Sequence, residues 1–418
     1  MNTFSLQHYI KIGKKLGISE DVLHAATTVA KNIQRNNPEI PIIFTLAHLS
    51  LLSGTRYSLV RSWIGRRGPE PYREHFLRKS ASKPKKSEKV GPKRAWRRIS
   101  IPTPALMKQQ RWIVERILHK IPKHEASVAF HHGSSILEAA RLHCGCRWLI
   151  KMDIENFFES IYEPKVYKVF ASLGFPHLLA FELTRLCTRI MPSDQYGFSF
   201  KKSTISRGKR GPDAYNITDQ IGTDDNILWE ARVPEKENSV LQHRLGSLPQ
   251  GALTSPLLAN LAVTEIDNAI QILASGHNLI YTRYADDIAL STTRTDFCRE
   301  EARLVIGKVS RILEVEGLSP HRTKTRIIPP GSRKIVLGLV VDGARPRLTR
   351  EFRNKLRLHA YMLGELGIKP SDHAESLSFR STLSMRRHIQ GKIAYAKHIE
   401  PDFAEKISKK LKDVNWLI

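Results

Sequence analysis

Alternating apolar and polar positions mark the centre of this chain of 418 residues. Residues 279–284 and 288–291 are two short apolar runs that are rich in strand-forming residues. Asp286 and Asp287 lie between them, so the pattern predicts a hairpin with two carboxylates at its tip. In residues 148–153, Trp148, Ile150 and Met152 alternate with the residues between them, which predicts a strand that ends on a third acid.

Apolar positions three or four residues apart predict helices through much of the remaining chain. We expect them at 20–33, 42–52, 104–120, 166–189, 255–274, from 296 to Gly317, and twice after Thr349. Shorter runs predict strands at 76–78, 96–101, 327–328 and 335–341. Gly391 interrupts the last helix; because glycine costs a helix about 1 kcal/mol relative to alanine, we expect a tightly packed neighbour there.

The charge balance points to a polyanionic partner. Lys and Arg number 67 against 40 Asp and Glu, for a formal net charge of +27. Nucleic acid is favoured over an anionic membrane, because the basic residues are spread along the whole chain rather than along one amphipathic helix. No apolar run reaches about 18 residues and no signal peptide is evident, so we expect no membrane partner.

Few cysteines favour a reducing, cytoplasmic setting, since only four occur in the chain. Cys144 and Cys146 lie beside His143, but one close pair without a second pair is a weak zinc signal. We therefore expect buried or free thiols at these positions.

Two stretches stand out by composition. Residues 79–98 hold nine Lys or Arg and one acid, and a Gly-Pro turn divides them. They predict a basic hairpin that contacts phosphates, and a solvated loop is the alternative. The basic residues that we expect to bind nucleic acid there are Lys85, Lys86, Lys93 and Arg94. Residues 192–246 are polar and rich in Gly, Lys and Ser, which is typical of an inserted loop region.

The three acids define the candidate chemistry. If the strand ending at Asp153 joins the hairpin of Asp286 and Asp287 in one sheet, the carboxylates repel one another unless a cation lies between them. Three carboxylates with two Mg²⁺ ions are the parts needed for in-line nucleotidyl transfer. The simpler alternative is that the Asp-Asp pair only shapes a β-turn.

Several motifs, in this order, resemble the central motifs of bacterial reverse transcriptases. They are Asp153 with Phe157-Phe158, Pro249-Gln-Gly with Ser255-Pro256, and Tyr284-Ala-Asp-Asp. Weaker matches extend the resemblance over roughly residues 55 to 405, ending at Gly391-Lys-Ile-Ala-Tyr395. The resemblance implies an α+β right-hand polymerase with a helical N-terminal extension. Its expected parts are the extension (1–60), fingers with the basic hairpin (61–152), a palm with an antiparallel sheet and the insertion (153–345), and a helical thumb (346–418).

The resemblance also implies roles by position. Two Mg²⁺ ions would be held by Asp153, Asp286, Asp287 and the carbonyl of Ile154. The residues implied to contact the dNTP or template are Arg97 at the triphosphate, Phe158 as a steric gate against a 2′-hydroxyl, Gln250 in the nucleotide and template pocket, and Lys324 at the leaving pyrophosphate. The thumb would grip the template–primer duplex, and Arg386 and Lys392 are the basic residues expected to contact it. The simpler alternatives are a core aromatic for Phe158, a surface arginine for Arg97 and a plain turn residue for Gln250.

Two further signatures relate the chain to retron enzymes and depart from their pattern. Asn-Ala-x-x-His is represented by Ala139-Ala140-Arg-Leu-His143, and Val-Thr-Gly by Val336-Leu337-Gly338. We therefore expect an RNA-directed DNA polymerase of the retron or defence-associated type, which copies a cognate structured noncoding RNA into DNA, with a possible effector protein, in antiphage defence. The alternative is a maturase-like RNA-binding protein that assists intron splicing.

Overall fold

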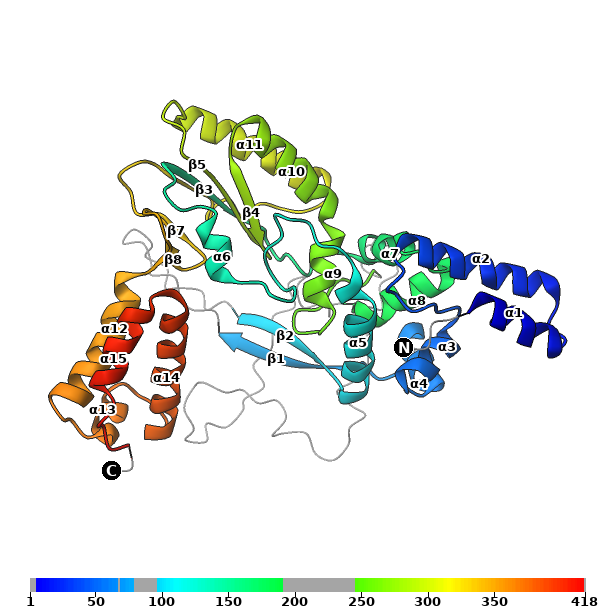
Figure 1. Ribbon diagram of the computed structural model, residues 1–418, viewed down its shortest axis with the longest axis horizontal. Helices are drawn as coiled ribbons and strands as arrows, with labels where there is room; N and C mark the ends of the chain where they lie inside the picture. Colours follow the sequence, from blue (N-terminus) through cyan, green and yellow to red (C-terminus); the bar gives the residue numbers. More distant parts are fainter. Residues whose placement is uncertain (1–4, 67, 79–95, 191–244, 417–418) are drawn as a thin grey trace, which may run out of the picture. The chain divides into compact units, whose positions relative to one another are not determined.

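The computed structural model describes residues 5–66, 68–78, 96–190 and 245–416. The chain divides into two compact units: a first unit of Met1–His132 with Glu155–Asn268, and a second unit of Gly133–Ile154 with Ala269–Ile418. Each combines helices with antiparallel strands, which confirms the predicted α+β class (Figure 1). The tip of the basic hairpin, with Lys85, Lys86, Lys93 and Arg94, and nearly all of the polar insertion lie outside the described residues.

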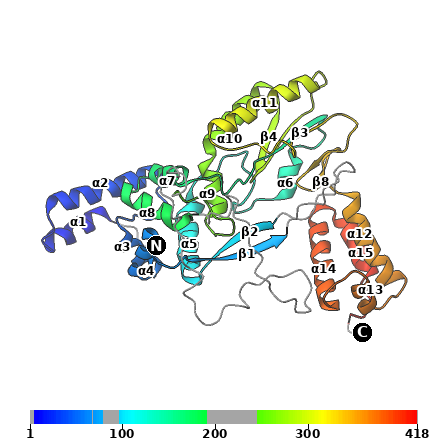
Figure 2. The same cartoon turned by 180° about the vertical axis from the view of Figure 1, so that it is seen from behind.

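The first unit is mainly helical. Its helices are α1 (Leu6–Lys15), α2 (Glu20–Asn36), α3 (Leu46–Ser53), α4 (Tyr57–Gly65), α5 (Pro104–Arg116), α7 (Glu163–Ser172), α8 (His177–Cys187) and α9 (Ser255–Ala262). The predicted helix over 166–189 is therefore interrupted, because Gly174 turns the chain with a φ of 86°. A Cβ on Gly174 would lie 2.9 Å from the backbone carbonyl of Asn32, so α2 packs closely on this turn (Figure 2).

Two strands of the first unit flank the basic stretch. β1 (Tyr72–Arg78) and β2 (Trp96–Pro102) pair antiparallel, with Tyr72 opposite Pro102 and Arg78 opposite Trp96. This confirms the predicted strands on either side of residues 79–95.

A four-stranded antiparallel sheet forms the centre of the second unit. It contains β3 (Trp148–Asp153), β4 (Ile280–Tyr284), β5 (Asp287–Thr292) and β6 (Arg326–Ile328), in the order β4-β5-β3-β6. The short helix α6 (Ile136–Arg141) precedes β3, and α10 (Thr264–Gly276) leads into β4. Helix α11 (Arg299–Val315) lies along the sheet and buries Ala302, Val305 and Val309 (Figures 1 and 2). The predicted hairpin with acids at its tip is confirmed by the pairing of β4 with β5.

The C-terminal part of the second unit has more elements than the sequence predicted. A three-stranded sheet of β7 (Ile335–Val336), β8 (Leu339–Val340) and β9 (Arg347–Leu348) precedes α12 (Arg350–Ala360), a π-helical turn (Tyr361–Glu365), α13 (Pro370–Ser376), α14 (Thr382–Ile399) and α15 (Pro401–Lys410). The single strand expected at 335–341 is wrong, because Leu337 and Gly338 adopt φ angles of 48° and 83° and reverse the chain. The sequence pattern missed α13 and α15, each of which starts at a proline.

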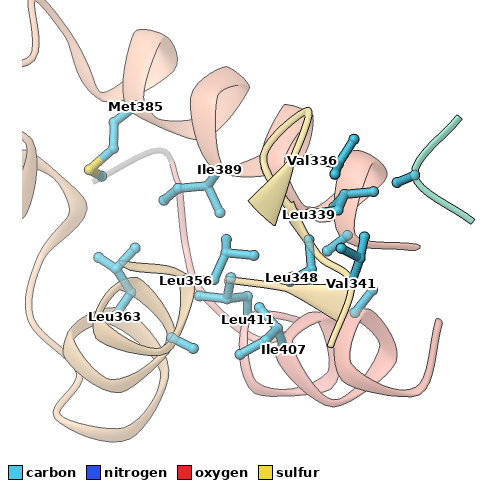
Figure 3. Close-up of a cluster of buried hydrophobic side chains, with 14 of the residues drawn as sticks. Val336, Leu339, Val341, Leu348, Leu356, Leu363, Met385, Ile389, Ile407 and Leu411 are labelled. Carbon is cyan, nitrogen blue, oxygen red and sulfur yellow. The ribbon is translucent and has the colours of Figure 1, made fainter. Parts of the chain in front are cut away.

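One hydrophobic cluster joins these helices to the central sheet of the same unit. Leu356, Met385 and Ile407 from the C-terminal helices pack with Val336 and Leu339 of the small sheet (Figure 3). Leu149 of β3 and Ala289 of β5 belong to the same cluster. The strands that carry the candidate acids are therefore stabilised by the same core as the C-terminal helices.

No single helix in the described part of the chain is long and apolar enough to cross a membrane. Helices α9 and α10 reach that length and apolarity only together, and they are bent by 52° at the break between them.

The close packing expected at Gly391 is wrong, because a Cβ placed there has no neighbour within 4 Å. Among the C-terminal helices, Gly364 is closely packed, since a Cβ there would lie 2.0 Å from the carbonyl oxygen of Lys410. We expect Gly364→Ala to lower the free energy of unfolding by about 1–3 kcal/mol through overpacking. Gly391→Ala should instead raise it by up to about 1 kcal/mol through helix propensity. Urea denaturation measures the free energy of unfolding of both variants. Equal changes in the two variants would contradict the close packing at Gly364.

Candidate active site

The structure brings the three predicted acids together at one end of the central sheet. Asp153 is the last residue of β3, and it pairs directly with Asp287, the first residue of β5. Asp286 lies in the two-residue turn before β5, and its carbonyl oxygen accepts a hydrogen bond of 3.0 Å from the backbone N–H of Ile154. Two like charges directly opposite each other in a ladder destabilise it, so this arrangement needs a compensating cation.

Unusual backbone geometry at the hairpin tip presents the acids. Ala285 has a φ of 56°, in the left-handed region that residues other than glycine rarely adopt. Its carbonyl oxygen accepts a hydrogen bond of 3.0 Å from the Arg283 guanidinium, and the Arg283 side chain is fully buried. The only sign of this supporting residue in the sequence is an arginine within an apolar strand, and it was not predicted.

Electrostatics at the tip favours a bound cation. Burial raises the pKa of Asp286, and the charges of Asp153 and Asp287 raise it further. Burial also raises the pKa of Asp287, with the nearby charge of Lys151 opposing the shift. Both shifts mean that the negative charges at this site are only partly compensated by the protein.

Lys324 supplies one compensating charge. Its Nζ atom lies 3.0 and 2.8 Å from the two carboxylate oxygens of Asp153. The side chain of Lys324 is 56% exposed, whereas that of Asp153 is 11% exposed. Within the described residues, no three Asp, Glu, His or Cys side chains converge as ligands of one ion. The donor set nevertheless fits a hard divalent cation, since carboxylate and carbonyl oxygens are its preferred ligands.

A buried histidine links the two strands of the hairpin. Nδ1 of His143 lies 2.7 Å from Oγ of Ser291 on β5, and Nε2 lies 2.7 Å from Oγ1 of Thr282 on β4. Burial lowers the pKa of His143 to about 4, so the ring is neutral at pH 7. The residue expected from the retron signature therefore bridges the two strands that carry the turn. Neighbouring Cys144 and Cys146 are free thiols.

Two predicted nucleotide-contacting residues of the first unit, Arg97 and Gln250, lie on β2 and on the turn that packs against it. The carbonyl oxygen of Gln250 accepts a hydrogen bond of 2.7 Å from the N–H of Ser100. A Cβ on Gly251 would lie 2.7 Å from Cγ2 of Ile99. The backbone of the turn therefore approaches β2 closely at Gly251. Ser255 opens α9, as predicted, and its hydroxyl bonds the preceding turn.

Arg189 connects this turn to both strands of the first unit. Its backbone exchanges two hydrogen bonds of 2.9 Å with Ser247, just before the turn. Its guanidinium donates to Oγ of Ser100 at 2.8 Å, and it forms ion pairs with Glu70 at 3.0 Å and Glu74 at 2.9 Å. Only 5% of the Arg189 side chain is exposed, so the pairs are shielded from water. This buried arginine fixes the turn of Gln250 relative to β2, and sequence reasoning missed it.

Four predicted contact residues have exposed or half-buried side chains. Arg97 is exposed on β2, opposite Leu77. Phe158 is half-buried, and its ring lies 5.7 Å from that of Phe157 and 6.2 Å from that of Phe130. In the second unit, the guanidinium of Arg386 and the ammonium of Lys392 each lie 5.6 Å from an aromatic ring centre. Burial lowers the pKa of Lys392, and the charge of Lys355 adds to this effect.

Comparison with known proteins identifies the class. Residues 83–341 match the family of reverse transcriptases (RNA-dependent DNA polymerases). The chain therefore belongs to the reverse transcriptase family and is an RNA-directed DNA polymerase.

The curated relatives point to a bacterial, retron-type branch of that family. The Retron Ec86 reverse transcriptase of Escherichia coli is 28% identical over 328 residues, 78% of this chain and 83% of the relative. The Retron Mx162 reverse transcriptase of Myxococcus xanthus is 29% identical over 294 residues, 67% of this chain and 52% of that protein. The chain is also similar to a solved telomerase from Candida albicans, in complex with a TWJ fragment of telomeric RNA. The match covers 85% of this chain and 60% of the telomerase chain, with 12% sequence identity. Its TM-score of 0.37 is too low to bear on the fold.

The neutral state of His143 predicts a pH dependence of stability. Its pKa is about 4 in the folded chain against an ordinary 6.5, so between these values only the unfolded chain takes up the proton. The contribution of His143 is complete above pH 6.5 and is lost as the pH falls towards 4, by up to about 3 kcal/mol. We expect the free energy of unfolding of His143→Gln to fall less steeply across this range than that of the natural chain. Urea denaturation at a series of pH values measures both curves. If the two curves run parallel, His143 does not bridge the strands as a neutral ring.

Proposed function

We propose that this enzyme copies a cognate structured noncoding RNA into DNA by nucleotidyl transfer at Asp153, Asp286 and Asp287. The observation that carries the proposal is the direct pairing of Asp153 with Asp287, beside Asp286 in the turn, in a chain of this family. The two strands fix the carboxylates in advance, which supplies the positioning that such a reaction needs.

The residues proposed to hold two Mg²⁺ ions are the three aspartates and the Ile154 carbonyl. When bound, the ions would activate the primer 3′-hydroxyl and neutralise the triphosphate and the leaving pyrophosphate. The partly uncompensated charge at Asp286 and Asp287 supports this assignment. Lys324 is exposed enough to move from Asp153 to an oxygen of the pyrophosphate, and its point charge suits that role.

The nucleotide contacts are proposed from the family motifs. Phe158 would pack under the sugar and exclude a 2′-hydroxyl, and Gln250 would line the nucleotide and template pocket. Arg97 would contact the triphosphate, where its exposed guanidinium can bond two oxygens at once. The buried network around Arg189 supports this assignment, because it fixes the Gln250 turn on the strand that carries Arg97.

We propose a right-hand arrangement with the expected division into N-terminal extension, fingers, palm and thumb. The basic hairpin, the N-terminal helices and the insertion would recognise the RNA. In the thumb, Arg386 and Lys392 would contact the duplex backbone with charged groups that lie over aromatic rings. The net charge of +27 supports binding that is spread over many phosphates.

The biological setting is proposed from the relatives and from the partly kept retron signatures. We propose that the enzyme works in the bacterial cytoplasm in antiphage defence, with a DNA product and an effector protein. All the curated relatives named above are retron reverse transcriptases, whereas none is named as a maturase.

Replacement of the hairpin acids tests the proposed site. We expect Asp286→Asn combined with Asp287→Asn to abolish dNTP incorporation on an RNA template–primer, because the cation ligands are lost. RNA affinity should stay within a few-fold, since it rests on distributed basic contacts. Asp402→Asn removes an exposed carboxylate of α15 and serves as the matched control. Unchanged incorporation in the double variant would place the reaction elsewhere.

Phe158 is tested by substrate selection. We expect Phe158→Ala to raise the ratio of kcat/KM for rNTP to that for dNTP by at least about tenfold, because a removed ring admits the 2′-hydroxyl. If Phe158 is instead only a core aromatic, the variant lowers the melting temperature and leaves this ratio unchanged. Single-nucleotide incorporation with matched rNTP and dNTP measures the ratio.

A further inference from the structure

A cavity in the first unit has no role in the reaction proposed above. Its volume is about 330 Å³, within the lower range of pockets that hold small ligands. Residues 118–124 and the His131-His132 pair form one side, and α9 with the first residue of α10 forms the other. The 3-10 turn Leu118–Lys120 packs directly against α9, so both walls belong to one body.

The first side of the cavity is basic. It contains Lys120, Lys123 and four histidines, and none of the residues that line the cavity is an Asp or a Glu. Nζ of Lys123 lies 3.0 and 3.1 Å from the two ring nitrogens of His131. No carboxylate of the described residues forms an ion pair with Lys123, whereas Lys120 pairs with the exposed Glu39 at 3.2 Å. The charge of Lys123 is therefore available to an anion.

The second side is apolar and fixed. Leu257 and Leu261 of α9 are half-buried and line it. The side-chain amide of Asn260 donates a hydrogen bond of 2.7 Å to the carbonyl of Ala129, which anchors the loop before His131 to α9. A cavity whose walls are joined in this way exists before a ligand arrives, which lowers the entropic cost of binding.

A ligand that matches both sides has an anionic group beside a flat apolar body. We propose that the cavity binds one unpaired nucleotide of the RNA, with its phosphate at Lys123 and its base against Leu257 and Leu261. Proteins recognise RNA largely through such unstacked nucleotides, whose bases lie on aromatic or apolar side chains. The inference rests on the proposed function, since it assumes that the partner is a structured RNA.

Two variants distinguish RNA binding in this cavity from non-specific attraction of RNA to a basic protein. Lys123→Gln removes the phosphate contact, and its matched control Lys31→Gln removes an exposed lysine of α2. Leu257→Trp fills the cavity without a change of charge, and its control Leu178→Trp alters an exposed leucine of α8. The measurement is fluorescence anisotropy of the full chain with a short unstructured oligoribonucleotide, repeated over a range of salt.

We expect Lys123→Gln and Leu257→Trp each to weaken binding at least about fivefold, with both controls within about twofold. The slope of log K against log salt should become shallower by about 0.7 in Lys123→Gln and stay unchanged in Leu257→Trp. Equal losses in Lys123→Gln and Lys31→Gln, or unchanged binding by Leu257→Trp, would overturn the site. Competition by a free nucleoside monophosphate at low concentration would overturn its assignment to an RNA chain.

Primer extension on a fully paired template–primer distinguishes failure of this inference from failure of the proposed function. Both cavity variants should extend such a duplex as the natural chain does. If the natural chain extends it and the cavity variants bind the oligoribonucleotide normally, only the cavity assignment fails. If the natural chain does not extend it, the proposed reaction fails, and the binding measurement still decides the cavity.

Discussion

The repulsion between Asp153 and Asp287 is the constraint on which the rest of the site depends. The register of β3 against β5 places these carboxylates directly opposite each other, and the left-handed turn adds Asp286 beside them. A sheet that carries such a pair is less stable than one without it, unless a cation is bound. The ammonium of Lys324 lies on Asp153. Burial raises the pKa of the other two acids, although the nearby charge of Lys151 opposes the shift at Asp287. The site is therefore prepared for a hard cation and the anionic substrate that accompanies it.

Several buried polar contacts hold this unfavourable arrangement in place. His143 bridges β4 and β5, and Arg283 bonds the carbonyl of the strained Ala285. The core shared with the C-terminal helices adds the stability that the repulsion removes. In the first unit, Arg189 has a comparable role for the Gln250 turn. In each unit, the residues that hold these turns in place are buried and are either uncharged or paired.

The sequence predicts most of the secondary structure and the meeting of the three acids, because strand alternation and the hairpin acids are local signals. It does not reveal the reversal at Leu337 and Gly338, since an apolar run from 335 to 341 looks like one strand when pairing is unknown. The sequence does not show that Gly364, rather than Gly391, is closely packed. The close approach of Gly364 to Lys410 depends on how α15 packs. Arg189 was missed because its partners Ser100, Glu70 and Glu74 are distant in sequence. Arg283 bonds Ala285, only two residues away, but the sequence does not show the left-handed turn that makes this contact. The cavity beside α9 likewise has no sequence motif.

The central claim is that the enzyme copies a structured RNA into DNA at the site of Asp153, Asp286 and Asp287. The most direct test is to purify the protein from its native locus, with and without Asp286→Asn and Asp287→Asn, and to sequence the nucleic acid bound to it. We predict one abundant RNA in both preparations and complementary DNA only in the active one. Intron RNA without DNA, or the same DNA in both preparations, would contradict the account.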